Sequence, residues 1–292
     1  MDFDLIIKNI ILILFSWIVG VKLAKSSNKP TNLKEQEQIM NTDLIQPVVN
    51  ELVTSEVEVV SKVEESIPQL YTLSILKQPL QKGQYVDEVT SKNQIVIHHT
   101  AGYGADSTIN YWNSNKERVA TNYIIDRNGK IIECVPPDKW AYHLYVNSPG
   151  NKIPNTYKKL GETYDKHSIG IELCNLGPLK VMGGRFLDIY NKRVPNEKVY
   201  KLSIPFKGFV YYERYSPQQL LALENLIIML CNKYDIPVLD EYKNFFDINL
   251  NALTKIPGIY THVNYRTDKS DAFPYQPLVD MLNGLHLKIN KA

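Results

Sequence analysis

The stretch Gln94-Ile95-Val96-Ile97-His98-His99 tells more about the fold than any other part of the sequence. It is short, rich in β-branched residues and free of Gly and Pro, which predicts a buried strand. Side chains alternate between the two faces of a strand, so Val96 and His98 share one face while His99 points to the other. We therefore expect at most one of these histidines to reach a given site. A strand histidine taken alone is more often a packed or surface residue than a ligand.

On both sides of this strand, further segments show strand and helix patterns in alternation. The pair Asn128-Gly129 is typical of a β-hairpin turn, and Ser216-Pro217 is typical of a capped helix start. The predicted elements are a helix from Asp106 or Ser107 to about Asn115, a hairpin over residues 122–135, a strand over 168–174, a helix opened at 216–217 and closed by Pro237, and a helix over 276–285. This order predicts an α/β domain in which helices flank a mixed central β-sheet.

The first 25 residues form a hydrophobic segment that differs from the rest of the chain. The apolar stretch Ile10–Val21 is shorter than the roughly 20 residues that a bilayer-spanning helix needs, but residues 5–24 just suffice if their lysines extend to the interface. A cleaved secretory signal, without a clear cleavage site, and a buried helix are the alternatives. We expect residues 1–25 to be a membrane anchor or signal segment, and lysines on both sides leave its topology open.

Residues 26–70 have the composition of an acidic flexible tether. They contain no aromatic residue, Gly, Cys or His, and they carry three lysines against eight acidic residues. The remaining residues, 71–292, are then one mildly basic catalytic domain, although the whole chain of 292 residues has a formal charge of only +2. This balance gives no reason to expect nucleic-acid binding, and three cysteines exclude a disulfide-stapled scaffold.

Two further segments carry residues that could perform chemistry. In the strand over 168–174, Glu172 shares a face with Gly170 between apolar neighbours, and a buried acid needs either a partner or a function. In a later loop, His262, Lys269 and Asp271 lie within ten residues. Two histidines and a carboxylate could form a zinc site with one open position, although on spacing alone residues 262–271 are more often a polar surface loop.

Taken together, these segments resemble the zinc-dependent N-acetylmuramoyl-L-alanine amidases of the amidase-2 or peptidoglycan-recognition-protein type, which include T7 lysozyme-like enzymes. The resemblance extends over roughly residues 80–285. It is strong because five motifs occur in the order typical of the family: Ile95-Val96-Ile97-His98-His99-Thr100-Ala101, Tyr123-Ile124-Ile125-Asp126-Arg127-Asn128-Gly129, Ala141-Tyr142-His143, Ser168-Ile169-Gly170-Ile171-Glu172, and His262 through Lys269-Ser270-Asp271.

The resemblance implies a role for each matching residue. It makes His98, His262 and Asp271 the ligands of one Zn²⁺ ion and leaves His99 structural. Glu172 is implied as the general base and acid, and Lys269 as the group that stabilises the oxyanion. These roles suit a metal that acidifies water and polarises a carbonyl.

Two positions are assigned to substrate binding on the same basis. His143 matches a histidine that lines the family's substrate cleft. Asn122 stands where many relatives carry His, some with a catalytic Tyr before it; here Thr121 precedes it, so a tyrosine-assisted mechanism is in doubt. Tyr103, Trp112 and Trp140 lie near the motifs and could stack on sugar rings or pack in the core.

The implied reaction is hydrolysis of the amide between N-acetylmuramic acid and the L-alanine of the peptidoglycan stem peptide. A non-catalytic peptidoglycan-binding module of the same fold is the main alternative, and a zinc hydrolase of another amide is the second. The expected partners are peptidoglycan and, through the N-terminal segment, a membrane; the domain would be a monomer facing the wall, periplasmic or extracellular. The insert over residues 177–215 would form a wall of the substrate groove.

Overall fold

The computed structural model describes residues 73–238 and 245–289. The description that follows concerns the unit Thr72–Ala292 alone. The predicted anchor or signal (1–25) and tether (26–70) lie outside the described residues. Within the described ranges, no helix combines the length and apolar character needed to cross a bilayer.

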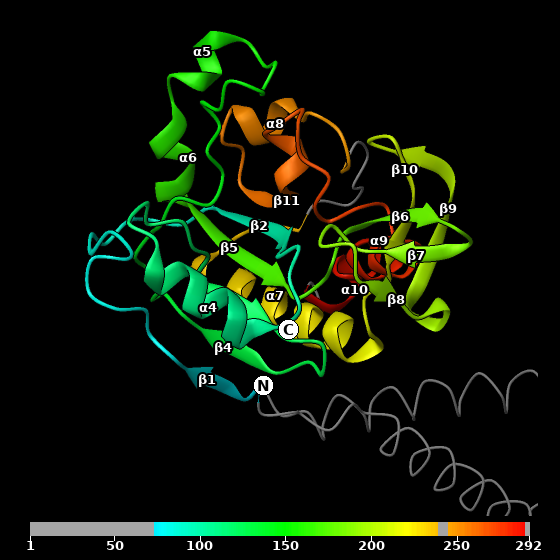
Figure 1. Ribbon diagram of the computed structural model, residues 1–292. Helices are drawn as coiled ribbons and strands as arrows, with labels where there is room; N and C mark the ends of the chain where they lie inside the picture. The colour runs from blue at the N-terminus through cyan, green and yellow to red at the C-terminus, as the bar shows by residue number, and fades with distance from the viewer. Residues whose placement is uncertain (1–72, 239–244, 290–292) are drawn as a thin grey trace, which may run out of the picture. The chain divides into compact units, whose positions relative to one another are not determined.

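A six-stranded mixed sheet forms the centre of the domain (Figure 1). Its strand order is β1 (Ile75–Lys77), β4 (Ile131–Glu133), β3 (Tyr123–Ile125), β5 (Ser168–Leu173), β2 (Gln94–His99) and β11 (Gly258–Thr261). The pairs β3–β5, β5–β2 and β2–β11 are parallel, whereas β3 and β4 form the antiparallel hairpin that Asn128-Gly129 predicted. The mixed sheet and the buried central strand expected from residues 94–99 are thus confirmed.

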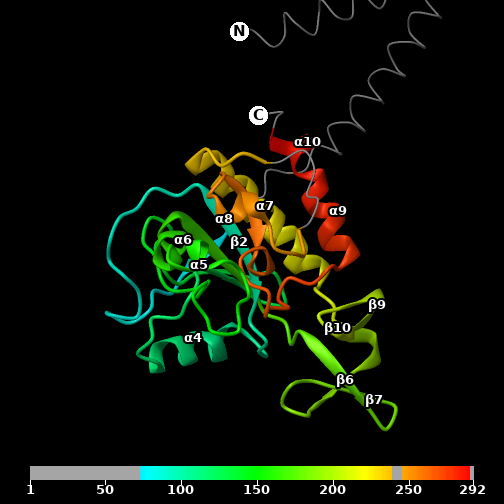
Figure 2. The same cartoon turned by 90° about the horizontal axis from the view of Figure 1, so that it is seen from above.

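Alternation along the strands divides the core between the two faces of this sheet. Ile95, Ile97, Ile169 and Ile171 belong to one apolar cluster, which includes the buried side chains of α7 (Pro217–Tyr234) and α9 (Gln276–Gly284). Residues whose side chains point to the other face of the sheet, such as Ile124, pack with α4 (Ala105–Ser114). In Figure 2, α4 and α7 accordingly lie on opposite sides of β2. Shorter helices complete the domain: α5 (Asn155–Lys158), α6 (Gly161–His167), α8 (Leu250–Leu253), α10 (His286–Ile289) and the 3-10 helices η1 (Asn196–Lys198) and η2 (His262–Asn264).

Local capping explains where the main helices begin. Ser216 accepts a hydrogen bond from the backbone N–H of Gln219, whose side chain bonds back to Ser216, so α7 begins with the predicted cap. The start of α4 differs from the prediction. Its N-cap is Gly104, and Ser107 is already inside the helix with its hydroxyl donating to the Gly104 carbonyl. The pattern, which offered Asp106 or Ser107 as the cap, therefore placed this helix start two or three residues too late.

The insert over residues 177–215 folds into a second, antiparallel sheet. Its order is β8 (Arg193–Val194), β7 (Arg185–Leu187), β6 (Pro178–Met182), β10 (Phe209–Glu213) and β9 (Val199–Phe206). Two tight turns, at Gly183-Gly184 and Lys207-Gly208, use left-handed backbone conformations at all four positions. A small apolar cluster, with Leu179 and Val194 among its members, lies within this sheet.

Candidate metal and catalytic site

The carboxyl ends of three parallel strands bring the predicted site residues together. His98 and Glu172 are paired directly in the register of β2 and β5. On the other side of β2, β11 ends at Thr261, and a capping box between Thr261 and Asn264 turns the chain into η2 at once, beginning with His262. Because in-register neighbours in a sheet share a face, His98 and Glu172 lie on the same face at the edge where parallel sheets commonly place ligands.

Three of these side chains converge on one buried point. The Nδ1 atoms of His98 and His262 are 3.0 Å apart, and Oδ2 of Asp271 lies 3.2 Å and 2.9 Å from them, respectively. All three residues are buried. Together they form a group whose ligand atoms could hold a metal ion.

The tautomer of His262 follows from its other ring nitrogen. Nε2 lies 2.9 Å from the carbonyl oxygen of Leu144, which can only accept a hydrogen bond. The proton of the neutral imidazole is therefore on Nε2. The Nδ1 lone pair of His262 faces the convergence point.

His98 is oriented by a longer hydrogen-bonded chain. The Ser168 hydroxyl lies 2.6 Å from the carbonyl of Tyr164 and donates to it, so the same hydroxyl accepts from Nε2 of His143 at 2.9 Å. Nδ1 of His143 is then the acceptor, and Nε2–H of His98 donates to it at 2.9 Å. The Nδ1 lone pair of His98 is thereby left free as well.

The pKa shifts of the three converging residues indicate which of their atoms can act as ligands. Burial lowers the pKa of His98 to about 4, with a further contribution from His262, against the opposing effect of Asp271. Burial also lowers the pKa of His262. Burial alone would raise the pKa of Asp271, but the two histidines hold it well below its usual range. Two neutral imidazoles and one carboxylate thus direct three acceptors at one point, an arrangement that a metal cation satisfies, and the residues present fit a metal ion.

Glycine at position 170 leaves space for the ring of His143, which belongs to the hydrogen-bonded chain that orients His98. A Cβ atom there would lie 2.8 Å from Cγ2 of Thr121 and 3.1 Å from Nδ1 of His143. The close approach that the sequence suggested at Gly170 is therefore made by Thr121 and by the ring of His143, which supports His98. His143 lines the cavity, where its role in substrate binding stays a prediction, and both of its ring nitrogens are engaged in the chain that orients His98.

Glu172 and Lys269 lie in the same cavity as the converging ligands. This cavity has a volume of about 630 Å³ and is open to solvent. Oε2 of Glu172 is buried and has no hydrogen-bond partner. Burial raises the pKa of Glu172 well above its usual range, with a contribution from Asp271, while the positive charge of Lys269 acts in the opposite direction. An unpartnered carboxylate beside a ligand cluster is the feature expected of a group that exchanges protons.

Asn122 does not lie in the cavity. Its side chain is buried; its amide nitrogen is within hydrogen-bond distance of three backbone carbonyls, and its Oδ1 accepts from the N–H of Gly170 at 3.0 Å. Since both ends of the amide are used, we correct the prediction that Asn122 binds substrate. It instead ties β5 to the segment after β4.

The neighbouring His99 occupies the opposite face of β2, as alternation predicted. Its Nδ1 lies 3.1 Å from the Tyr215 hydroxyl and 3.3 Å from the backbone N–H of Ala272, so it holds the loop that carries Asp271. The three cysteines are buried, and Trp112 and Trp140 are buried too, whereas Tyr103 is partly exposed in the cavity wall. Ser168 and the Leu144 carbonyl were not predicted. Ser168 lies on the same face of its strand as Gly170 and Glu172, and this alternation is the signal that could have identified Ser168.

Comparison with known proteins agrees with this geometry. The sequence matches the Amidase_2 family, described as N-acetylmuramoyl-L-alanine amidase, over residues 89–274. A search of curated proteins finds no match.

Several solved structures resemble this one. They include PlyL (15% identity, 73% of this chain and 96% of that chain, TM-score 0.40), the N-acetylmuramoyl-L-alanine amidase LysC from Clostridium intestinale URNW (17%, 73% and 99%, 0.38) and AmpD (16%, 74% and 96%, 0.40). Likeness at these TM-scores is too weak to support inference about the site, so the assignment rests on the family match. With that match extending over more than half of its length, the chain belongs to the Amidase_2 family of N-acetylmuramoyl-L-alanine amidases.

Proposed function

We propose that this chain hydrolyses the amide bond between the lactyl group of N-acetylmuramic acid and the L-alanine of the peptidoglycan stem, with one Zn²⁺ ion held by His98, His262 and Asp271. One observation carries the proposal. Three unprotonated ligand atoms converge beside an unpartnered carboxylate oxygen of Glu172 in a single open cavity. Membership of the amidase family supports the choice of bond.

The donor set favours zinc over harder cations. Two imidazoles and one carboxylate are typical of catalytic zinc sites, which keep one position open. Bound there, zinc would supply Lewis-acid chemistry that polarises the scissile carbonyl and acidifies water. The chain's own contribution is to fix the tautomers of both histidines, through the Leu144 carbonyl and the His143–Ser168 chain.

Glu172 is the proton carrier in this proposal. Its carboxylate, which lines the cavity, takes a proton from the attacking water and later returns it to the leaving amine. A carboxylate with a raised pKa is suited to both steps, because its proton affinity lies nearer to the working pH than that of an exposed glutamate.

Lys269 stabilises the negative charge that develops on the carbonyl oxygen during attack. It lines the cavity together with Glu172 and Asp271. A positioned ammonium group at such a site lowers the barrier because its charge is already oriented before the reaction begins.

A peptidoglycan substrate places this domain outside the cytoplasmic membrane. We propose that residues 1–25 serve its export or anchoring, with residues 26–70 as a spacer that lets the domain reach the wall. All the residues proposed for catalysis come from one chain, so the proposal requires no partner subunit.

The test uses the full-length chain with zinc and purified peptidoglycan. We expect soluble stem peptides with a free N-terminal L-alanine and no new reducing sugar ends. Metal content is measured on the same sample. Peptidoglycan binding without release by the zinc-loaded protein would instead identify a binding module. Cleavage of soluble peptides but not of whole sacculi would indicate a different amide substrate.

The Glu172→Gln variant tests the assigned proton carrier. We expect stem-peptide release to fall about 100- to 10,000-fold, with zinc content unchanged, because glutamine cannot accept the proton. The matched control is Glu197→Gln, an exposed residue of the insert outside the cavity. Full activity in Glu172→Gln would show that another group carries the proton.

A further inference from the structure

The cavity has a second wall that the proposed mechanism does not use. This wall consists of Tyr103, in the loop after β2, together with Ile189 and Tyr190, in the loop between β7 and β8 of the insert. These side chains are 45%, 44% and 56% exposed, although all three have large apolar groups. The two tyrosine rings are stacked, with centroids 5.9 Å apart and an interplanar angle of 29°. We call these two rings the tyrosine platform.

A fully buried carboxylate holds the platform in place. The side chain of Asp188 has 0% exposure. Its Oδ1 accepts from the backbone N–H groups of Tyr190 at 2.9 Å and Lys192 at 2.8 Å. Its Oδ2 accepts from the Tyr103 hydroxyl. The Lys192 ammonium lies 4.8 Å from the centre of the Tyr103 ring. Burying a charge is costly unless its hydrogen bonds are satisfied. Here they are satisfied by two backbone N–H groups of the β7–β8 loop and by the Tyr103 hydroxyl, which comes from the loop after β2.

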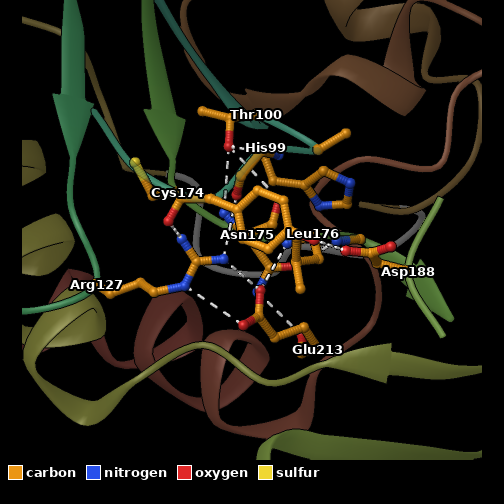
Figure 3. A network of polar contacts seen from close by, with 12 residues as sticks. His99, Thr100, Arg127, Cys174, Asn175, Leu176, Asp188 and Glu213 are labelled. Carbon is orange, nitrogen blue, oxygen red and sulfur yellow. Dashed lines mark hydrogen bonds and ion pairs between the residues drawn. The ribbon is translucent and has the colours of Figure 1, made fainter. Parts of the chain in front are cut away.

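An ion pair fixes the base of the same wall. Arg127 forms a 2.7 Å ion pair with Glu213 of β10, which also accepts from the N–H of Leu176 (Figure 3). Arg127 also donates to the carbonyl oxygens of Gly102 and Tyr103. The loop carrying Tyr103 is thus held at its backbone by Arg127 and at its hydroxyl by Asp188. Such a preorganised aromatic surface loses little side-chain entropy when a ligand packs on it.

The backbone of the β7–β8 loop offers little to a peptide ligand. The N–H groups of Asp188, Tyr190, Asn191 and Lys192 all donate within the loop. Peptides recognised by strand addition need free backbone donors and acceptors, and these donors are occupied. The loop instead presents aromatic and apolar surface to the cavity. A sugar ring has a C–H face that packs on such surface and a rim of hydroxyls that stays in water.

We propose that the tyrosine platform is a saccharide subsite, which binds a sugar of the glycan strand next to the muramic acid whose amide is cleaved. This inference rests on the proposed function for the identity of the neighbouring residue. It makes the insert the part of the chain that distinguishes polymeric glycan from a bare muramyl peptide.

The first experiment measures binding of peptide-free glycan strands to the full-length chain, so it does not require amide cleavage. We expect Tyr190→Ala to weaken binding at least five-fold and Tyr103→Phe, which keeps the ring and loses the bond to Asp188, two- to three-fold. The matched control is Ile204→Ala, a 77% exposed residue of the same insert outside the cavity, which should bind as the wild type does. Failure of the wild type to bind glycan, or equal binding by Tyr190→Ala, would overturn the proposal.

The second experiment compares two substrates that differ only in glycan length. We expect Tyr190→Ala to lower kcat/KM on glycan polymer about ten-fold, mainly through KM, and to leave kcat/KM on the monosaccharide muramyl peptide within two-fold. An equal loss on both substrates would mean that the platform contacts the peptide, and would overturn the inference. Tyrosine-dependent glycan binding in a chain that releases no stem peptide would refute the proposed amidase reaction while supporting the subsite.

Discussion

The two walls of the cavity are held in place by different interactions. On the side of β2, β5 and β11, buried strand register places His98 and Glu172 next to each other, with His262 at the end of the adjacent strand. On the side of the insert, a partly exposed loop is held by the buried acids Asp188 and Glu213. The comparison teaches that strand register places His98 and Glu172 and buried hydrogen bonds orient the histidine rings, whereas ion pairs and a buried carboxylate at the insert hold the surface proposed to bind sugar. The two walls should therefore respond to different mutations.

The largest effect is expected on the sheet side, from His262→Ala. Removing one of three ligands should weaken zinc binding more than about 1,000-fold and abolish stem-peptide release. Metal affinity is measured by competition with a chelator, and His286→Ala, in α10, is the control. Glycan binding through the insert should persist. Loss of both functions would show that the two walls are not independent.

The complementary change on the insert side is Arg127→Met. It leaves the buried Glu213 carboxylate without its cation, which costs about 3–5 kcal/mol. We expect lower stability in urea unfolding and weaker glycan binding, with zinc affinity within two-fold of the wild type. Arg185→Met, at an exposed position of β7, controls for loss of charge. A parallel drop in zinc affinity would contradict the separation of the walls.

A smaller effect is expected from Ser168→Ala, which breaks the chain that orients His98. The variant leaves Nε2 of His143 without its acceptor, so the tautomer of His98 is no longer imposed. Loss of such supporting hydrogen bonds typically lowers metal affinity about 10- to 100-fold. Chelator competition measures it, with Ser114→Ala at the end of α4 as control. Unchanged affinity would show that packing alone orients His98.

The smallest effect concerns Asp165, a buried acid behind the sheet wall. It accepts from the N–H groups of His143 and Leu144, and burial raises its pKa to about 7, against the opposing effects of these bonds and of Lys92. The folded state holds this proton where the unfolded state has lost it, so the contribution to stability falls as pH rises from about 4 to about 7.

Asp165→Asn removes this dependence on pH. The free energy of unfolding of the variant should rise by about 1–3 kcal/mol relative to that of the wild type between pH 4 and pH 7. Urea unfolding of both proteins over this range, with chelator present, measures the effect. Lys92, whose pKa burial lowers to about 7, contributes with the opposite sign above this range, and Asp165 itself raises that pKa, so higher pH values are left out of the comparison. Parallel stability profiles would show that Asp165 keeps an ordinary pKa.

Sequence reasoning succeeded where a periodic pattern imposes the geometry. Alternation along residues 94–99 and 168–174 gave the strands, the opposite directions of His98 and His99, and the shared face of Gly170 and Glu172. The family motifs then indicated which polar residues meet at the sheet edge. That step was necessary because strand order and the parallel β2–β11 pairing are not visible in local sequence.

The errors and omissions concern polar side chains with partners far away in sequence. The placement of Asn122 in the cleft was an error and the support of His98 by His143 was an omission, because their partners, the Gly170 N–H and Ser168, are 48 and 25 residues away. The second sheet was also missed. Its turns at Gly183-Gly184 and Lys207-Gly208 were readable hairpin signals, but its strands are short and largely exposed, so hydrophobic alternation is weak there.

Gly170 constrains how this site can change during evolution. A Cβ atom at this position would lie 2.8 Å from Cγ2 of Thr121 and 3.1 Å from Nδ1 of His143, so a substitution there requires a change at position 121 and a small shift of the His143 ring. Among related chains, position 170 should therefore vary together with position 121 first and with position 143 second. Where the ring at position 143 is lost as well, another acceptor has to orient the first ligand. Glycine at position 170 thus marks chains that keep the space for the ring supporting His98.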